Sequence, residues 1–406
     1  MISLCMIVRD EARQLPRFLA GTDGLWDELC VADTGSCDET REILQQAGAK
    51  IIDFPWIDDF SAARNASLAL ATGDWIIYLD ADEYPAPALI DEIRALEHDA
   101  QAGAATLLIQ NLREQGKVEE QRLLRMFRRD GDIRFEHAIH ESIAGPVATM
   151  LAERNLSTRH LGSPVEHIGY HPSLMQRKNK RERDRRILEN CLARQPGDLY
   201  SGFKLLELAN YWSDAQLAEQ TARHLHRQLQ TLPPEALTRN HWFSDLLARV
   251  ARTLYLSTPD EALRFLAQHP ITPSRDYLET RGLFLEALGH LAAAEHDFSA
   301  ALALCRQACL PGPMHVGALL GLGRVKLGVG DMIQAKSLID QAIRLNPENA
   351  TSLRYALLIA ELSGGKPTVQ QYCRELGELY GVTQTLADLA AEFGLTVAVT
   401  NSVLAP

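Results

Sequence analysis

The chain has 406 residues, of which 46% are hydrophobic and 23% charged, and its formal net charge is −12. This length is enough for two or three domains with large cores. The negative charge argues against a nucleic-acid-binding protein, because contact with a phosphate backbone requires a basic surface.

The cysteines and the N-terminus favour a cytoplasmic protein. Seven cysteines are scattered along the chain without a C-x-x-C pair, and their number is odd, which is typical of a reduced compartment. The apolar stretch 1–8 is too short for a signal peptide because Arg9, Asp10 and Glu11 follow it, and no run reaches transmembrane length. We therefore expect no integral membrane segment, and a peripheral contact at the inner face of the membrane stays open.

The first third alternates between expected strands and expected helices. Apolar runs predict strands over 2–8, 28–32, 50–54 and 75–79, and helical spacing predicts helices over 11–20, 36–47 and 61–71. Alternation with short links indicates a parallel, Rossmann-like sheet. No G-x-G-x-x-G or Walker A glycines follow the first strand, so a bound diphosphate must be held in another way.

An acidic motif follows the fourth expected strand. Asp80 and Asp82 form a D-x-D pair, and Glu83 comes directly after it. Hard cations such as Mg²⁺ and Mn²⁺ prefer oxygen ligands and often share substrate phosphates. Open α/β sheets bind ligands at the carboxyl ends of their strands, where Asp33 is also expected. The alternative interpretation is an acidic turn in solvent.

Four ordered segments resemble a known enzyme family. The segments 3–11 (SLCMIVRDE), 31–36 (VADTGS), 59–65 (DFSAARN) and 79–83 (LDADE) are similar to family 2 (GT-A) glycosyltransferases. The likeness is closest to the SunS-like branch, which includes peptide S-glycosyltransferases and envelope-sugar transferases, and it covers about residues 1–190. Arg9-Asp10 departs from the more usual Lys-Asn.

The resemblance implies roles for individual residues. The uridine-type nucleotide of a UDP-sugar donor would contact Arg9, Glu11, Asp33, Arg64 and Asp80. A Mn²⁺ or Mg²⁺ ion would be bound by Asp82 and Asp80, with His167 of a His-x-Gly-Tyr segment as the third ligand and His171 as the next candidate.

The acceptor base is expected in segment 136–143 (EHAIHESI). In the resembling family an acidic residue after the D-x-D motif deprotonates the acceptor, so we nominate Glu141, with His140 as the alternative. Alternation predicts a strand here that places Glu136, Ala138 and His140 on one face. The segments 122–127 and 133–135 are expected to form a hairpin around Arg-Asp-Gly-Asp. An exposed polar strand without catalytic function is the other interpretation.

A basic segment, 176–186, joins the two halves of the chain. It holds seven Lys or Arg residues in eleven positions. We interpret it as a solvated helix face, and the alternative is a patch that faces phosphate.

The second half is expected to be helical and repetitive. Small and large residues recur at the same offsets in two segments, typical of tetratricopeptide repeats. They are Leu278, Gly282, Gly289, Ala294, Phe298 and Ala301 in the first copy, and Leu319, Gly323, Gly330, Ala335, Ile339 and Ala342 in the second. The extra length between the copies predicts a loop or a helix extension near 305–313.

The sequence therefore predicts an α/β domain followed by an all-α solenoid. The expected limits are 1–175 for the GT-A domain, 176–197 for the basic linker helix and 198–406 for the repeats. The resemblance implies metal-dependent, inverting transfer of a sugar to an acceptor hydroxyl or thiol, on a peptide, protein or envelope glycan. The repeats would bind a partner or form a homodimer. The alternative function is a catalytically inactive GT-A fold that serves as a protein-binding scaffold.

Overall fold

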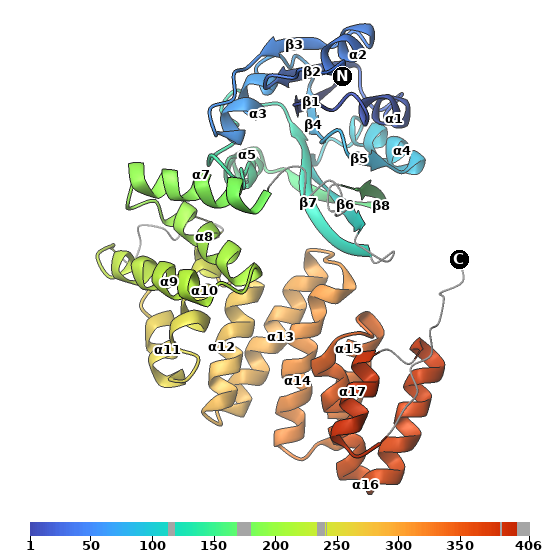
Figure 1. The fold of residues 1–406 in the computed structure, drawn as a ribbon, viewed down its shortest axis with the longest axis vertical. Helices are drawn as coiled ribbons and strands as arrows, with labels where there is room; N and C mark the ends of the chain where they lie inside the picture. Colours follow the sequence, from blue (N-terminus) through green and yellow to red (C-terminus); the bar gives the residue numbers. More distant parts are fainter. Residues whose placement is uncertain (113–117, 169–179, 234–239, 241, 382–383, 396–406) are drawn as a thin grey trace. The chain divides into compact units, whose positions relative to one another are not determined.

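The computed structural model describes residues 1–112, 118–168, 180–233, 240, 242–381 and 384–395. The chain divides into two compact units, 1–232 and 233–406, which are coloured from blue to red along the sequence in Figure 1. Within the described ranges, no helix is long and apolar enough to cross a membrane. The expected domain limits are not tested by this division and stay predictions.

The first unit contains an eight-stranded mixed sheet with the strand order β3-β2-β1-β4-β7-β6-β8-β5. The strands are β1 (Ile2–Val8), β2 (Glu28–Asp33), β3 (Lys50–Asp53), β4 (Trp75–Tyr78), β5 (Glu83–Pro85), β6 (Ala102–Leu112), β7 (Val118–Arg128) and β8 (Ser157–His167). The first four strands are parallel, which confirms the predicted Rossmann-like start. Because β1 lies inside this sheet, Leu4 packs in one apolar cluster and Cys5 in another.

Helices connect the strands and continue past the sheet. They are α1 (Leu15–Gly21), α2 (Thr40–Gln46), α3 (Phe60–Leu68), α4 (Pro87–Leu96), α5 (Ala144–Arg154), α7 (Lys180–Arg194), α8 (Leu199–Tyr211) and α9 (Ala215–Leu229). Helix α2 begins at Thr40 and not at residue 36 as predicted. The reason is that the Asp33 carboxylate accepts hydrogen bonds from Gly35 and Ser36, and Gly35 has a left-handed φ of 105°.

The half-buried carboxylate of Glu28, at the start of β2, joins β2 to the segment before β4 and to β3. Glu28 accepts hydrogen bonds from the backbone and hydroxyl of Thr72 and from the backbone of Gly73, at 2.5 to 3.1 Å. It also pairs with Lys50 at 2.5 Å. Burial raises the pKa of Glu28, but Lys50 and the hydrogen bonds outweigh it and lower the pKa to about 2.

Two predictions for the region after β4 are wrong. The hairpin partner of β7 is β6, and residues 133–135 are not a strand although Ile133 and Phe135 are buried. Segment 136–143 is not a strand either, because His137 and His140 have left-handed φ values of 72° and 53°. The alternation expected for its faces therefore does not apply.

The second unit is helical, as predicted. Its helices are α10 (Phe243–Leu254), α11 (Pro259–Leu266), α12 (Arg275–Ala287), α13 (Leu291–Gln307), α14 (Val316–Gly328), α15 (Met332–Leu345), α16 (Ala350–Tyr380) and α17 (Gln384–Glu392), with a 3₁₀ turn at Gly312–His315. The predicted repeats are the pairs α12/α13 and α14/α15. The extra residues between them extend α13 and form the 3₁₀ turn.

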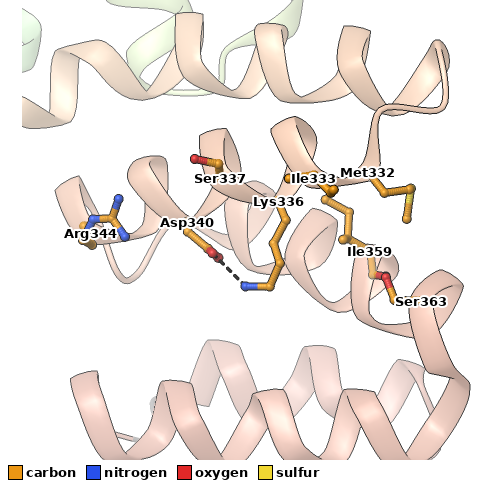
Figure 2. A pocket seen from close by; sticks show the side chains of 8 residues that line it. All are labelled: Met332, Ile333, Lys336, Ser337, Asp340, Arg344, Ile359 and Ser363. Carbon is orange, nitrogen blue, oxygen red and sulfur yellow. Dashed lines mark hydrogen bonds and ion pairs between the residues drawn. The ribbon is translucent and has the colours of Figure 1, made fainter.

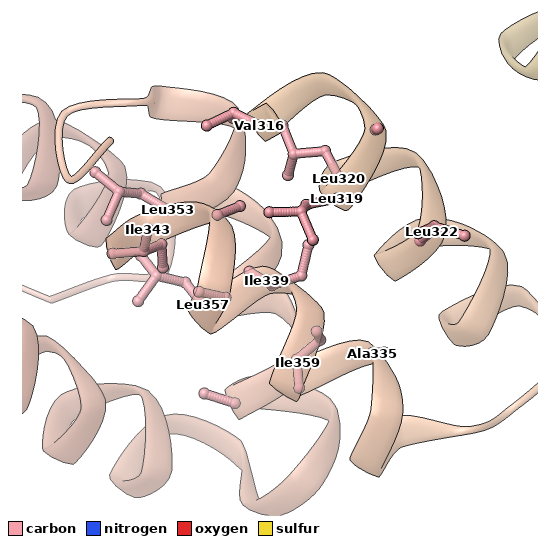
Figure 3. Packing of buried hydrophobic residues seen from close by; sticks show 14 of the residues in the cluster. Val316, Leu319, Leu320, Leu322, Ala335, Ile339, Ile343, Leu353, Leu357 and Ile359 are labelled. Carbon is pink, nitrogen blue, oxygen red and sulfur yellow. The ribbon is translucent and has the colours of Figure 1, made fainter. Parts of the chain in front are cut away.

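Small residues let the repeat helices cross closely. A Cβ atom on Gly282 would lie 2.9 Å from the ring of Phe298, and one on Gly321 only 2.4 Å from it. Figure 3 shows the apolar side chains of α14, α15 and α16 that fill the space between these helices, including Leu319, Ile339 and Leu357. Helix α16 is interrupted at Gly364 and Gly365, whose backbone angles are not helical.

An open hollow of about 390 Å³ lies on α15 and α16 (Figure 2). Lys336 and Asp340 form an ion pair of 2.7 Å inside it, beside Ile333 and Ile359. None of its lining residues belongs to the predicted site.

Candidate active site

One arginine connects two of the predicted site residues. Helix α3 begins at the cap Asp59, whose carboxylate accepts a hydrogen bond from the backbone of Ala62, and this start places Arg64 beside the end of β4. Arg64 Nε donates to Glu141 Oε1 at 2.6 Å, and Nη2 donates to Asp80 Oδ1 at 2.9 Å. Residues from three separate segments thus meet at one guanidinium.

The charges in this cluster stabilise one another. Burial disfavours charge on Arg64, but Asp80 and Glu141 raise its pKa above the ordinary value. Burial likewise disfavours the Asp80 carboxylate, but Arg64 and Arg125 lower the pKa of Asp80 well below its usual range. Asp80 is therefore ionised, and Oδ1 is engaged by Arg64. Its Oδ2 is the oxygen with which it could meet a metal.

Glu83 holds the turn of the D-x-D motif, and sequence analysis gave it no role. Its carboxylate is 1% exposed and accepts a hydrogen bond of 3.0 Å from the backbone N–H of Asp80 and one of 2.5 Å from Arg125. Burial raises the pKa of Glu83, although Arg125 acts in the opposite direction. A third acidic residue directly after the motif was the only sequence signal for this role.

Sheet pairing brings His167 to Asp82. Strand β5 runs antiparallel to β8 with Glu83 opposite His167, and the backbone of Ile168 donates to the carbonyl of Asp82 at 3.2 Å. His167 Nε2 then lies 3.7 Å from Asp82 Oδ2. The other ring nitrogen, Nδ1, lies 2.6 Å from the amide oxygen of the buried Asn111. Because that oxygen only accepts, Nδ1 carries the proton and Nε2 faces Asp82.

The pair Asp82–His167 fits a divalent cation. Two ligand atoms 3.7 Å apart can both lie about 2.1 Å from one ion. Within the part of the chain that the structure describes, no group of three His, Cys, Asp or Glu side chains converges on a metal site. The remaining ligands would come from Asp80, water or substrate oxygens, which is usual for Mg²⁺ and Mn²⁺. His171 lies outside the described residues.

Three of the predicted nucleotide-binding residues, Arg9, Glu11 and Asp33, lie at or just after the carboxyl ends of β1 and β2. Val8 and Asp33 are partners in the parallel pairing, so Arg9 and Asp33 share one edge of the sheet. Asp33 is 6% exposed and uses Oδ1 for its own turn, while Oδ2 lies 3.8 Å from Arg41. Arg9 is exposed and Glu11 half-buried.

The two candidate bases differ in their surroundings. The Glu141 side chain is 16% exposed and bonded to Arg64. The His140 side chain is exposed, yet the protein around it and the ammonium group of Lys204 lower the pKa of His140. Only Glu141 is thus joined to Asp80 through a shared partner.

The described part of the basic segment is mostly paired with acidic neighbours. Arg183 contacts Asp184 at 2.8 Å, and Arg186 contacts Asp58 at 2.9 Å. Burial lowers the pKa of Lys180, while Asp184, Asp82 and Asp80 act against that shift, so this amine lies within electrostatic range of the D-x-D motif. Residues 176–179 lie outside the described residues.

Known proteins resemble both halves of the chain. Residues 3–149 match the family model "Glycosyl transferase family 2". A TPR repeat-containing protein of Synechococcus elongatus is 37% identical over 314 residues, which are 77% of this chain and 76% of the relative. The prophage-derived glycosyltransferase SunS of Bacillus subtilis is 26% identical over 206 residues, 48% of this chain and 46% of the relative. An uncharacterized glycosyltransferase of Rickettsia felis is 36% identical over 92 residues, 23% of this chain and 32% of the relative.

The Rossmann-like sheet with its D-x-D turn and the helical repeats define a GT-A transferase domain with C-terminal tetratricopeptide-like repeats. Residues 3–149 form a glycosyl transferase family 2 domain, and the chain is a glycosyltransferase.

Proposed function

We propose that this glycosyltransferase uses a divalent cation, Mn²⁺ or Mg²⁺, and a UDP-type sugar donor, and that it transfers the sugar with inversion to an acceptor hydroxyl or thiol. The observation that carries the proposal is the pair Asp82 Oδ2–His167 Nε2 at 3.7 Å, with the imidazole oriented by Asn111. Orientation of this kind by a buried partner is usual for histidines that bind metals.

In this proposal some residues bind the donor and its cation, and Glu141 acts on the acceptor. A bound cation would offset the charge that grows on the departing diphosphate. Asp82 and His167 would hold it, with Asp33 and Asp80 on the nucleotide. Glu141 would take the proton from the acceptor as it attacks, and Arg64, which pairs with both Glu141 and Asp80, holds that carboxylate beside Asp80. Direct attack by the acceptor requires no covalent nucleophile on the protein.

A donor panel tests the metal and the nucleotide. The protein is incubated with UDP-sugars and other nucleotide sugars, with and without Mn²⁺, and release of the nucleotide is measured. We expect release from a UDP-sugar that requires the metal and is lost in Asp82→Asn, while the exposed Asp91→Asn on α4 behaves like the parent. If no donor is hydrolysed, or if Asp82→Asn hydrolyses as well as the parent, the scaffold alternative replaces this proposal.

A second variant tests the base. Glu141→Gln should keep the affinity for UDP and Mn²⁺ and retain only a small residual turnover, because the amide can still accept the Arg64 hydrogen bond but cannot take the proton of the acceptor. Turnover at the parental rate in Glu141→Gln would remove Glu141 from this role, and His140→Gln is then the next variant to measure.

The acceptor is proposed to be a peptide, a protein or an envelope glycan. Tetratricopeptide-like repeats offer an extended surface on which a protein partner or a second copy of the chain could dock. Sedimentation of the purified protein tests the homodimer, and flotation with vesicles tests a peripheral membrane contact.

A further inference from the structure

The loop that carries the proposed base is held in an unfavourable backbone conformation. His137 and His140 both have positive φ values, of 72° and 53°. Residues with a side chain rarely adopt this left-handed conformation, so the surrounding structure must hold it. Such conformations are common at functional sites.

The sheet side of the domain holds the beginning of this loop. The side chain of Asn65 donates to the carbonyl of Phe135 at 2.9 Å and accepts from its N–H at 2.8 Å. The backbones of Glu136 and Ser142 exchange two hydrogen bonds, of 2.9 and 3.0 Å, and close the loop at its base. Asn65 directly follows Arg64 on α3, so the helix that positions the arginine also positions the loop.

Helix α8 holds the other end. The Tyr200 hydroxyl donates a hydrogen bond of 2.6 Å to the carbonyl of His140, the residue before Glu141. The Tyr200 ring stacks on the imidazole of His137, with centroids 3.5 Å apart and planes 12° apart. One tyrosine, itself 5% exposed, therefore contacts both left-handed residues.

Apolar packing supports the same arrangement. Ile139, between the two histidines, is 5% exposed and packs in a cluster with Ile187 and Leu188 of α7 and Leu205 of α8. Helices α7 and α8 thus cover the loop with their own core residues.

We propose that Tyr200 is a positioning residue for Glu141, and that α7 and α8 are part of the catalytic unit. The proposal rests on the assignment of Glu141 as the base. Tyr200 fixes the peptide group that precedes Glu141 and so aims the carboxylate at the acceptor. Small displacements of a catalytic group reduce the rate strongly, because reactivity depends on alignment. The domain limit predicted between residues 197 and 198 would assign Tyr200 to the repeats. A transferase domain that ended there would lack the contacts of Tyr200 with the loop of Glu141.

The test uses the full-length protein and two tyrosines of the same helix. Tyr200→Phe removes the hydroxyl and keeps the ring, and Tyr211→Phe is the control because Tyr211 is 63% exposed. The rate of UDP release is measured with Mn²⁺ and the UDP-sugar that the donor panel identifies. In Tyr200→Phe we expect kcat to fall about tenfold, the size expected for one buried hydrogen bond. The KM for the donor and the Mn²⁺ requirement should not change.

A double-variant cycle separates positioning from general structural damage. If Tyr200 acts through Glu141, Tyr200→Phe should have no further effect in a Glu141→Gln background. An equal loss of kcat in both backgrounds overturns the proposal, and so does a Tyr200→Phe protein with parental kcat.

Hydrogen exchange gives a result that does not depend on activity. The N–H groups of Glu136 and Ser142 each donate to the carbonyl of the other residue. In Tyr200→Phe these two amides should exchange faster than in the parent and in Tyr211→Phe. Unchanged exchange overturns the proposal. If exchange is faster but Glu141→Gln is as active as the parent, the base assignment has failed, and the role of Tyr200 toward Glu141 fails with it, while its hold on the loop stands.

Discussion

Replacing Glu83 by glutamine tests the buried ion pair behind the D-x-D turn. Glu83 and Arg125 are 1% and 10% exposed, so neither charge can regain water when its partner is lost. Glutamine can accept from the Asp80 N–H or from Arg125, but it then presents a donor to the other. Breaking a buried pair on one side costs about 3–5 kcal/mol. We expect about 3 kcal/mol, because one hydrogen bond survives.

This loss should be visible in thermal unfolding. For a unit of 232 residues, about 3 kcal/mol corresponds to a decrease in Tm of roughly 6–12 °C. Scanning calorimetry of the parent and of Glu83→Gln measures the decrease.

The matched control removes both charges. In Glu83→Gln with Arg125→Gln, no unpaired buried charge remains, so part of the lost stability should return. The reasoning is refuted if Glu83→Gln melts within about 2 °C of the parent. It is also refuted if the stability that the double variant loses equals the sum of the losses in Glu83→Gln and Arg125→Gln measured singly.

Three further predictions concern the metal site, the sheet and the repeats. Asn111→Ala should weaken Mn²⁺ binding in titration calorimetry about 10–100-fold, because it removes the side chain that orients the His167 imidazole. The neighbouring Gln110→Ala is the control and should bind Mn²⁺ like the parent. Equal affinities of Asn111→Ala and the parent would contradict a role of Asn111 in orienting His167. The pKa of Glu28 is lowered to about 2, so its contribution, about 3 kcal/mol, is present above pH 4.5 and is lost as the pH falls toward 2. Urea unfolding at a series of pH values should therefore show that the free energy of unfolding falls less steeply between pH 4.5 and 2 in Glu28→Gln than in the parent. The same pH dependence in both proteins would contradict the role assigned to Glu28. Gly321→Ala should destabilise the second unit by about 1–3 kcal/mol, because the added Cβ would lie 2.4 Å from the ring of Phe298; an unchanged urea midpoint would show that the ring can move away.

The sequence was most informative where local pattern and burial agree. Runs such as 2–8 and 75–78 are almost entirely apolar because their strands are covered on both faces. A predicted helix between successive strands favours parallel neighbours, since parallel strands need such a crossover. The repeats were visible because Gly282 and Gly323 occupy positions where two helices leave no room for a side chain.

The rest depended on contacts that local pattern does not contain. The left-handed residues His137 and His140 break the alternation from which a strand was predicted. Strand β8 pairs with β6 and β5, which are distant in sequence, so His167 was placed by resemblance alone. Glu83 was passed over because an acidic residue after a turn is usually in water, and only the pairing of β5 shows it to be buried.

The register between β5 and β8, at the edge of the sheet, determines which side chain faces Asp82. Glu166 contacts Arg17, and its neighbour His167 turns to Asp82, because successive side chains leave a strand on opposite sides. Slippage by a single residue would exchange the two and place a carboxylate where the imidazole now stands. Along this edge, a one-residue deletion should be far more damaging to the enzyme than most substitutions.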